Sequence, residues 1–134
     1  MKYFTLNELI KSDTATKYGI KNEPNEAQKQ NLLYLIEHVL EPARAKLGMP
    51  IIVTSGYRNP QLNAKVGGSA SSQHKEGEAV DVTCADNTKL YNIFKTQGKF
   101  DQLIWEKGND KQPAWVHVSV KRNGKNRKQE LRIK

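Results

Sequence analysis

The chain has 134 residues, of which 37% are hydrophobic and 27% are charged, and this fits one domain, residues 1–134, with its own core. Its single cysteine, Cys84, excludes an intramolecular disulfide, and no stretch is apolar enough for a membrane span or a signal peptide, so we expect synthesis as a cytoplasmic chain. The net charge of +8 favours anionic surroundings such as a cell wall, a membrane surface or nucleic acid.

The first predicted element is a short helix that begins after Thr5. Phe4 and Thr5, followed by Glu8, form the pattern of a hydrophobic staple and a capping box. Residues 17–23 then predict a loop.

A longer helix is predicted to begin at Pro24 and to end at Gly48, because proline suits a first helical turn and glycine a C-terminus. Its apolar positions recur at helical spacing: Leu32, Leu35, Ile36, Val39, Leu40, Ala43 and Leu47. Pro42 lies inside this pattern and predicts a kink or a division of the helix. His38 lies beside the apolar stripe, and we expect it to be a partly exposed residue without a ligand role.

The second half of the chain predicts mainly strands. Residues 51–54 form a β-rich run that enters the turn SGYRNP, and residues 61–73, rich in small and polar side chains, predict mostly loop. A strand is predicted over 79–83, and runs over 100–106 and 115–120 predict a hairpin with a long loop.

A helix is predicted over 87–97, with Gly98 at its end. Short helices first and strands gathered later indicate an α+β fold with a mainly antiparallel sheet and N-terminal helices packed on one face.

The last fourteen residues, KRNGKNRKQELRIK, hold much of the positive charge. They fit a solvated tail at least as well as a binding patch for an anionic partner. Few aromatic residues interleave with the charges, so stacking on bases is poorly supported and no nucleic-acid partner is expected.

Three residues form a pattern that a metal ion can use. By strand alternation Asp81 points away from the valines on either side of it, and so does His117. His74 comes seven residues before Asp81, with Gly77 between them, so a turn there can fold His74 back over the strand. Two imidazoles and one carboxylate are a common ligand set for catalytic zinc.

The run SGYRNPQLNAKVGGSASSQHKEGEAVDV, followed by WVHVS, resembles the zinc D-Ala-D-Ala carboxypeptidase family. This family includes phage endolysin peptidases and shares its fold with the hedgehog signalling domain. The resemblance covers about residues 30–120 and is sharpest over 55–63, 72–81 and 115–119.

The resemblance implies that His74, Asp81 and His117 bind one zinc ion, and that Arg58 faces a carbonyl or carboxylate of the substrate. It also implies a hedgehog-like, D,D-peptidase-like fold. Six further residues are predicted to contact substrate: Ser55, Tyr57, Ser72, Gln73, Trp115 and Ser119. Cys84 is expected to be a small buried residue and not a fourth ligand.

The sequence offers three acidic candidates for the general base. Many relatives carry an acidic residue three positions before the last zinc histidine, where this chain has Ala114. If the apolar residues of the hairpin face the core, Glu106 shares the side of His117, and it is therefore the preferred base. Glu76 and Glu78 are the alternatives.

We therefore expect a monomeric zinc peptidase that hydrolyses peptide bonds in peptidoglycan stem peptides, as a carboxypeptidase or as an endolysin-type endopeptidase. Such a lysin would act on the cell wall after release from the cytoplasm. Ala114 favours an alternative, a catalytically inactive, metal-stabilised module that binds the cell wall. A basic nucleic-acid binder ranks last, because no recognition motif supports it.

Overall fold

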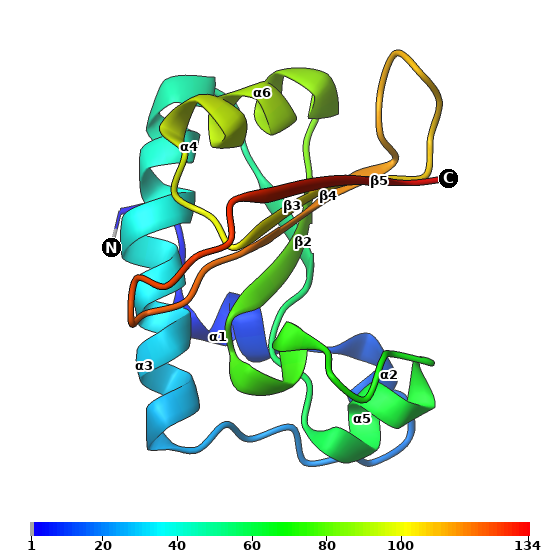
Figure 1. Ribbon diagram of the computed structural model, residues 1–134. Coiled ribbons are helices and arrows are strands. Elements are labelled where there is room, and N and C mark those ends of the chain that lie inside the picture. Colours follow the sequence, from blue (N-terminus) through cyan, green and yellow to red (C-terminus); the bar gives the residue numbers. More distant parts are fainter. Residues whose placement is uncertain (1) are drawn as a thin grey trace.

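A computed structural model describes residues 2–134 and shows an α+β fold (Figure 1). The helices are α1 (Leu6–Ile10), α2 (Asp13–Lys17), α3 (Glu26–Leu35), α4 (Glu41–Leu47), α5 (Pro60–Lys65) and α6 (Asn87–Gln97), with a π-helical turn η1 (Ile36–Leu40) and a 3-10 turn η2 (Gln73–Glu76). The strands are β1 (Ile52–Ser55), β2 (Ala79–Thr83), β3 (Gln102–Glu106), β4 (Trp115–Ser119) and β5 (Gln129–Ile133). Among residues 2–134, no helix is both long and apolar enough to cross a bilayer.

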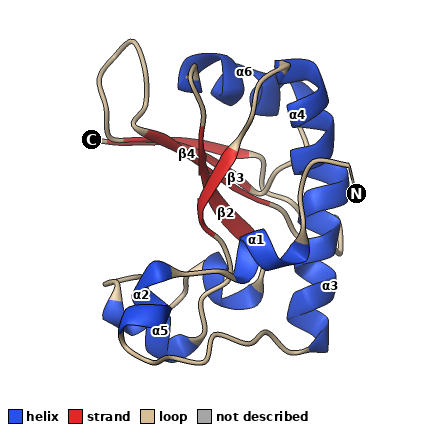
Figure 2. Ribbon diagram, turned by 180° about the vertical axis from the view of Figure 1, so that it is seen from behind, coloured by secondary structure: helices blue, strands red, loops and turns tan. Residues whose placement is uncertain are grey.

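The strands form one sheet in the order β1-β2-β4-β3-β5. The first three neighbouring pairs are antiparallel, as predicted, whereas β5 pairs with β3 in parallel, so the sheet is mixed. The helical rod of α3, η1 and α4, together with α6, covers one face of the sheet (Figures 1 and 2). The core between these layers includes Leu35, Leu40, Val80, Phe94 and Val118, each no more than 1% exposed.

The predicted N-terminal helices are present, with one correction to where the long helix begins. The capping box of Thr5 and Glu8 begins α1, as predicted. The long helix begins at Glu26 and not at Pro24, because Asn25 caps it and accepts a hydrogen bond from the Gln28 amide.

Pro42 was predicted to kink or divide the long helix, and the π-helical turn η1 separates α3 from α4 just before it. A proline nitrogen cannot donate to the carbonyl four residues earlier, so the regular ladder must be interrupted at that point. In η1 the Glu41 amide donates instead to the carbonyl of Ile36, five residues earlier. Gly48 ends α4 in the left-handed conformation, with φ of 73°.

Two further predictions were wrong. Residues 60–65 form helix α5 and not a loop, because Asn59 caps them and Pro60 occupies the first helical position. The C-terminal segment is not a solvated tail throughout, because Gln129–Ile133 adds β5 to the sheet. Helix α2, capped by Ser12, ends at Lys17, so the loop predicted over 17–23 begins one residue later.

Strand β5 is fixed at its start by a buried carboxylate. Asp101 is fully buried, and it accepts hydrogen bonds from the Arg127 guanidinium, the shortest 2.7 Å, and from the Arg127 amide at 2.8 Å. The Asp101 carbonyl also accepts from the Gln129 amide at 2.9 Å. Burial alone would raise the pKa of the Asp101 carboxyl, but the hydrogen bonds from Arg127 outweigh it, and the pKa lies below its ordinary value.

This depressed pKa predicts an acid-sensitive contribution to stability. The contribution is complete above the ordinary aspartate pKa of about 4 and is lost as the pH falls through the lower folded value. We expect the urea concentration at the unfolding midpoint of the native chain to fall in this pH window. The midpoint of the Arg127→Gln variant should fall less, because that variant has already lost the ion pair. If the urea midpoint depended on pH equally in the two proteins, the Asp101–Arg127 pair would not be the source of the acid sensitivity.

Candidate metal centre

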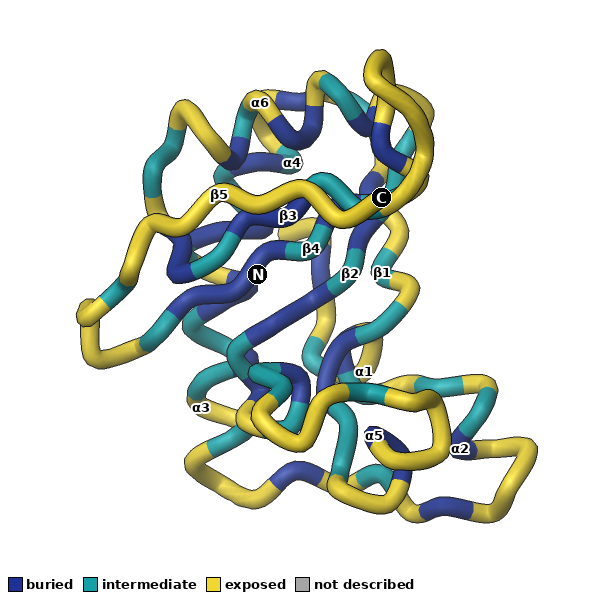
Figure 3. The backbone as a smooth tube through the Cα atoms, turned by 45° about the vertical axis from the view of Figure 1, so that its right-hand side comes forward, coloured by how far each residue is buried: buried dark blue, intermediate teal, exposed yellow. Residues whose placement is uncertain are grey.

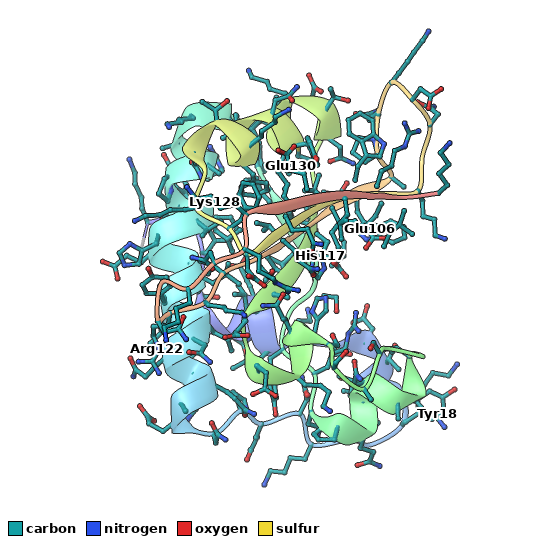
Figure 4. All side chains as sticks on the ribbon, viewed as in Figure 1. Tyr18, Glu106, His117, Arg122, Lys128 and Glu130 are labelled. Atoms are coloured by element: carbon teal, nitrogen blue, oxygen red, sulfur yellow. The ribbon has the colours of Figure 1, made fainter. Side chains whose placement is uncertain are left out.

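The structure brings His74, Asp81 and His117 together on the sheet face that the rod and α6 leave free. Asp81 on β2 and His117 on β4 are register partners in neighbouring strands, and His74 comes from η2. One ligand atom from each of the three residues lies within 4.8 Å of the other two. Figure 4 shows His117 on the side of the sheet that faces α2 and α5.

Successive side chains of β2 and of β4 point to opposite faces of the sheet, which explains why Asp81 and His117 face away from the core. Val80, Val82, Val116 and Val118 are all 0% exposed and pack under the rod and α6. The residues between them must therefore point to the opposite face. That face is polar and enclosed, since the Asp81 and His117 side chains are only 14% and 12% exposed.

Turn η2 is held in place by α3 and by a glycine. Ser72 caps it, and its hydroxyl accepts a hydrogen bond from the His74 amide. Gly77 ends it with φ of 73°, and a β-carbon there would lie 2.6 Å from the Gln28 carbonyl oxygen. Only glycine satisfies both the conformation and the close approach.

The ring of His74 is oriented by a backbone carbonyl. Its Nδ1 donates to the Gly56 carbonyl oxygen at 2.7 Å, because a carbonyl can only accept. The other nitrogen, Nε2, is thereby left without a proton in the neutral ring and lies 3.4 Å from Asp81 Oδ2. A backbone carbonyl on the far nitrogen is the usual support of a metal-binding histidine.

This arrangement predicts an effect for Gly56→Ala. A β-carbon at position 56 would collide with the backbone of Leu9, whose carbonyl already accepts from the Tyr57 amide at 2.6 Å. We expect a loss of about 1–3 kcal/mol in stability, together with weaker zinc binding, because the carbonyl that orients His74 must move. Thermal unfolding and zinc titration measure both effects. The matched control is Gly48→Ala, which has open space around it and should lose stability alone.

The electrostatics keep Asp81 ionised. Burial alone would raise the pKa of the Asp81 carboxyl, but hydrogen bonds and charge interactions with His117 and His74 outweigh it and hold that pKa well below its ordinary value. His117 Nδ1 lies 2.9 Å from Asp81 Oδ1. Two neutral imidazole nitrogens and one carboxylate oxygen suit zinc in number and type and leave a fourth position for water, so the residues fit such an ion.

Arg58 lies at the β1 end of the centre, held by three contacts. Its Nε donates to Ser55 Oγ at 3.1 Å, its Nη1 donates to Asn63 Oδ1 at 3.3 Å, and its Nη2 lies 3.6 Å from Asp81 Oδ2. Its backbone amide also donates to the His74 carbonyl at 3.0 Å, which joins the SGYR turn to η2. The guanidinium side chain is 16% exposed and retains donors for a bound group.

Asn63 was not predicted as part of this site. It is 3% exposed, and its Nδ2 donates to the Ser69 carbonyl at 2.8 Å. A β-carbon at Gly68 would collide with the Asn63 amide and approach Arg58 Nη1 to 2.9 Å, so the loop closes tightly over both side chains. The signal in the sequence was the Asn59–Pro60 helix start, which fixes where Asn63 lies on α5.

Glu106 lies on the same face as His117, next to Trp115 of β4, its register partner. This makes Glu106 and His117 diagonal neighbours, whose β-carbons are usually about 7–8 Å apart, within reach of a glutamate side chain. Burial raises the pKa of the Glu106 carboxyl, and the negative charge of Asp81 adds to the effect. Figure 4 shows Glu106 and His117 on the same side of the sheet.

The two alternative bases lie on the other side of the centre. Glu76 is exposed at the end of η2. Glu78 is partly buried; burial raises the pKa of its carboxyl, and Gln73 Nε2 donates to it at 3.3 Å.

The structure places the predicted substrate contacts in different environments. Ser55 and Ser72 are half-buried and already hydrogen-bonded to Arg58 and His74, respectively, as described above. Tyr57 is 4% exposed and belongs to the core cluster. Ser119 is 0% exposed, and its hydroxyl accepts from the Gln102 amide at 3.0 Å, so its side chain is engaged within the sheet.

Gln73 and Trp115 are both half-buried. The Gln73 Oε1 atom is buried without a hydrogen-bond partner among residues 2–134. Cys84 packs against the core and lies outside the ligand cluster, and His38 stacks on Tyr34 in the helical rod with ring centroids 4.2 Å apart.

A cleft of about 790 Å³ opens along β1 beside this centre. One wall is β1 with the turn that follows it, including Ser55 and Arg58, and the other is the segment that joins α1 to α2. The cleft and the candidate centre share Arg58, whereas His74, Asp81 and His117 do not line the cleft.

Comparison with known protein families gives a match over most of the chain. The profile of the family described as Peptidase M15 matches residues 2–119, which spans the three ligand positions, Arg58 and Glu106. Among curated proteins, none matches the chain significantly.

Proposed function

The chain belongs to the peptidase M15 family, and from that premise we propose that it is a zinc-dependent peptidase acting on peptidoglycan stem peptides. It would cut either as a D-Ala-D-Ala carboxypeptidase or as an endolysin-type endopeptidase. One observation carries the proposal: two histidines and an aspartate, from three separate segments, converge within 4.8 Å beside a half-buried arginine.

In this proposal His74, Asp81 and His117 hold one zinc ion. A bound zinc ion supplies Lewis acidity, which lowers the pKa of water and polarises a carbonyl group. The Gly56 carbonyl fixes the tautomer of His74, and the ionised Asp81 contributes the negative charge that the cation needs.

Two further side chains act on the substrate. Arg58 is permanently charged and prepositioned by Ser55 and Asn63, so it stabilises the developing oxyanion or binds a terminal carboxylate. Glu106 accepts the proton from the attacking water and delivers it to the leaving amine, a role for which a partly buried carboxylate with a raised pKa is suited.

The direct test is digestion of purified peptidoglycan with the full chain, with and without a chelator, followed by mass analysis of the fragments. The proposal expects released stem-peptide fragments that vanish with chelator and return when zinc is added. Release of single D-alanine would identify a carboxypeptidase, and larger fragments an endopeptidase. Undiminished release in the presence of chelator would rule out a metal-dependent mechanism.

A second candidate function rests on Ala114. This exposed residue stands where many relatives have an acidic side chain, which favours a metal-stabilised module that binds cell wall without cutting it. Such a module would bind zinc and sediment with peptidoglycan but release no fragments, so the same digestion separates the two functions.

A further inference from the structure

Strand β5 lies outside the region that the family profile matches, yet it borders the candidate metal centre. The profile ends at residue 119, and β5 spans Gln129–Ile133. Across the sheet, His117 pairs with Ile104, and Ile104 pairs with Leu131. In the next row Trp115 pairs with Glu106, and Glu106 pairs with Ile133.

The contacts of β5 settle which face each side chain occupies. The Tyr91 hydroxyl of α6 donates to Glu130 at 3.3 Å, and the Arg132 guanidinium lies 5.6 Å from the Trp105 ring centroid, which also places it on the α6 side. Because neighbours along a strand alternate, Leu131 and Ile133 point to the opposite face, the face of the metal centre. Figure 4 shows Glu130 on the α6 side of β5 and Glu106 on the other.

Leu131 and Ile133 remain unusually exposed for aliphatic side chains, at 37% and 42%. Beside them Ile104 is 6% exposed. Together these three residues form a surface that we name the apolar shelf. Figure 3 shows β5 as an exposed strand (yellow) at one edge of the sheet.

We propose that the apolar shelf binds the part of a stem peptide that extends away from the reacting bond, and so makes the enzyme select for substrate length. This inference rests on the proposed function. Arg58, beside β1, and the apolar shelf, on β3 and β5, flank the metal centre on opposite sides. Strands lie about 4.8 Å apart, so β5 is about 10 Å from His117 on β4, the length of about three extended residues.

Charge on the strand favours a peptide over a second copy of this chain. Lys128 and Lys134 flank β5 at its two ends, whereas Arg127 and Arg132 are paired with Asp101 and Asp110. Pairing two such edges would bring the like charges of the lysines together. Stem peptides carry carboxylates as well as alanyl methyl groups, so they match both the basic flanks and the apolar shelf.

The test compares a long and a short ligand. The double variant Leu131→Thr/Ile133→Thr places β-branched side chains, which favour strands, at both positions but removes most of the apolar surface. The matched control, Glu130→Thr/Arg132→Thr, makes the same replacements on the opposite face of β5. Binding of a synthetic stem pentapeptide and of N-acetyl-D-Ala-D-Ala is measured by calorimetry on the full chain with chelator present, so that no turnover occurs.

We expect the shelf variant to bind the pentapeptide about tenfold more weakly and the dipeptide unchanged, because only the longer ligand reaches β5. The opposite-face control should retain the native preference for the pentapeptide. Equal pentapeptide affinities in the native and shelf-variant proteins would overturn the inference, as would equal weakening by the control. Concentration-dependent self-association that the shelf variant abolishes would overturn it too, because a second copy would then be the occupant.

The two proposals fail in distinguishable ways. If the native chain binds the pentapeptide through the apolar shelf but releases no product with zinc, the peptidase function fails and the shelf stands. If it hydrolyses both peptides, and the shelf variant shows the native kcat/KM for each, the shelf fails and the peptidase function stands.

Discussion

Replacing His117 by alanine is expected to abolish zinc-dependent hydrolysis. The change removes one of the three proposed ligands from a site whose side chains all lie on fixed elements. Its register partner on β3, Ile104, has no atom that could take the place of the imidazole. A bound metal ion is worth several kcal/mol of transition-state stabilisation, which corresponds to at least about a thousandfold in rate. The expected result is that loss in kcat/KM, together with a large fall in zinc affinity measured by competition with a chromophoric chelator.

The matched control is His38→Ala, which removes the one histidine outside the cluster, on η1. This variant should retain zinc binding and activity, which would show that the effect of His117→Ala is specific to that histidine. Far-UV circular dichroism of both variants checks that the sheet persists. A His117→Ala protein that binds one zinc ion with native affinity would remove His117 from the metal centre, whatever its activity.

Much of the fold follows from local signals in the sequence. The alternation of apolar and polar residues in AVDVT and WVHVS predicted two strands and the face on which Asp81 and His117 lie, and both strands are found with the valines buried. The hairpin of β3 and β4 was also predicted, and its register puts Glu106 on the His117 face, as the face argument required.

Other features depend on contacts that no local pattern reveals. Strand β5 is exposed along its length, and its only apolar residues, Leu131 and Ile133, make an alternation too short to stand out in a basic segment. Its position comes from pairing with β3 and from the Asp101–Arg127 ion pair. The carbonyl that orients His74 belongs to Gly56, 18 residues earlier, and it is placed by the close approach of Leu9. Such backbone contacts have no residue-type signature, which is why the supporting network of the centre was not predicted.

The proton-transfer role is the proposal with the second largest expected effect. Glu106→Gln preserves the size and hydrogen-bonding shape of the side chain but removes its ability to accept a proton. General acid–base groups contribute about 10²- to 10⁴-fold to rate, so we expect kcat to fall by that factor with KM and zinc content little changed. Stopped assays on a soluble stem pentapeptide, with zinc content measured on the same samples, give both quantities.

Glu76→Gln and Glu78→Gln are the matched controls, because each carboxylate lies beside η2, on the other side of the same centre. If Glu106 is the base, both controls stay within a few-fold of native kcat. A large loss in Glu78→Gln and none in Glu106→Gln would transfer the role to the η2 side. The geometry argues against that outcome, because Glu78 shares a hydrogen bond with Gln73 at 3.3 Å, whereas no protein hydrogen bond within residues 2–134 engages the Glu106 carboxylate. A carboxylate without a protein partner, one residue row from His117, is free to accept a proton from water at the metal centre.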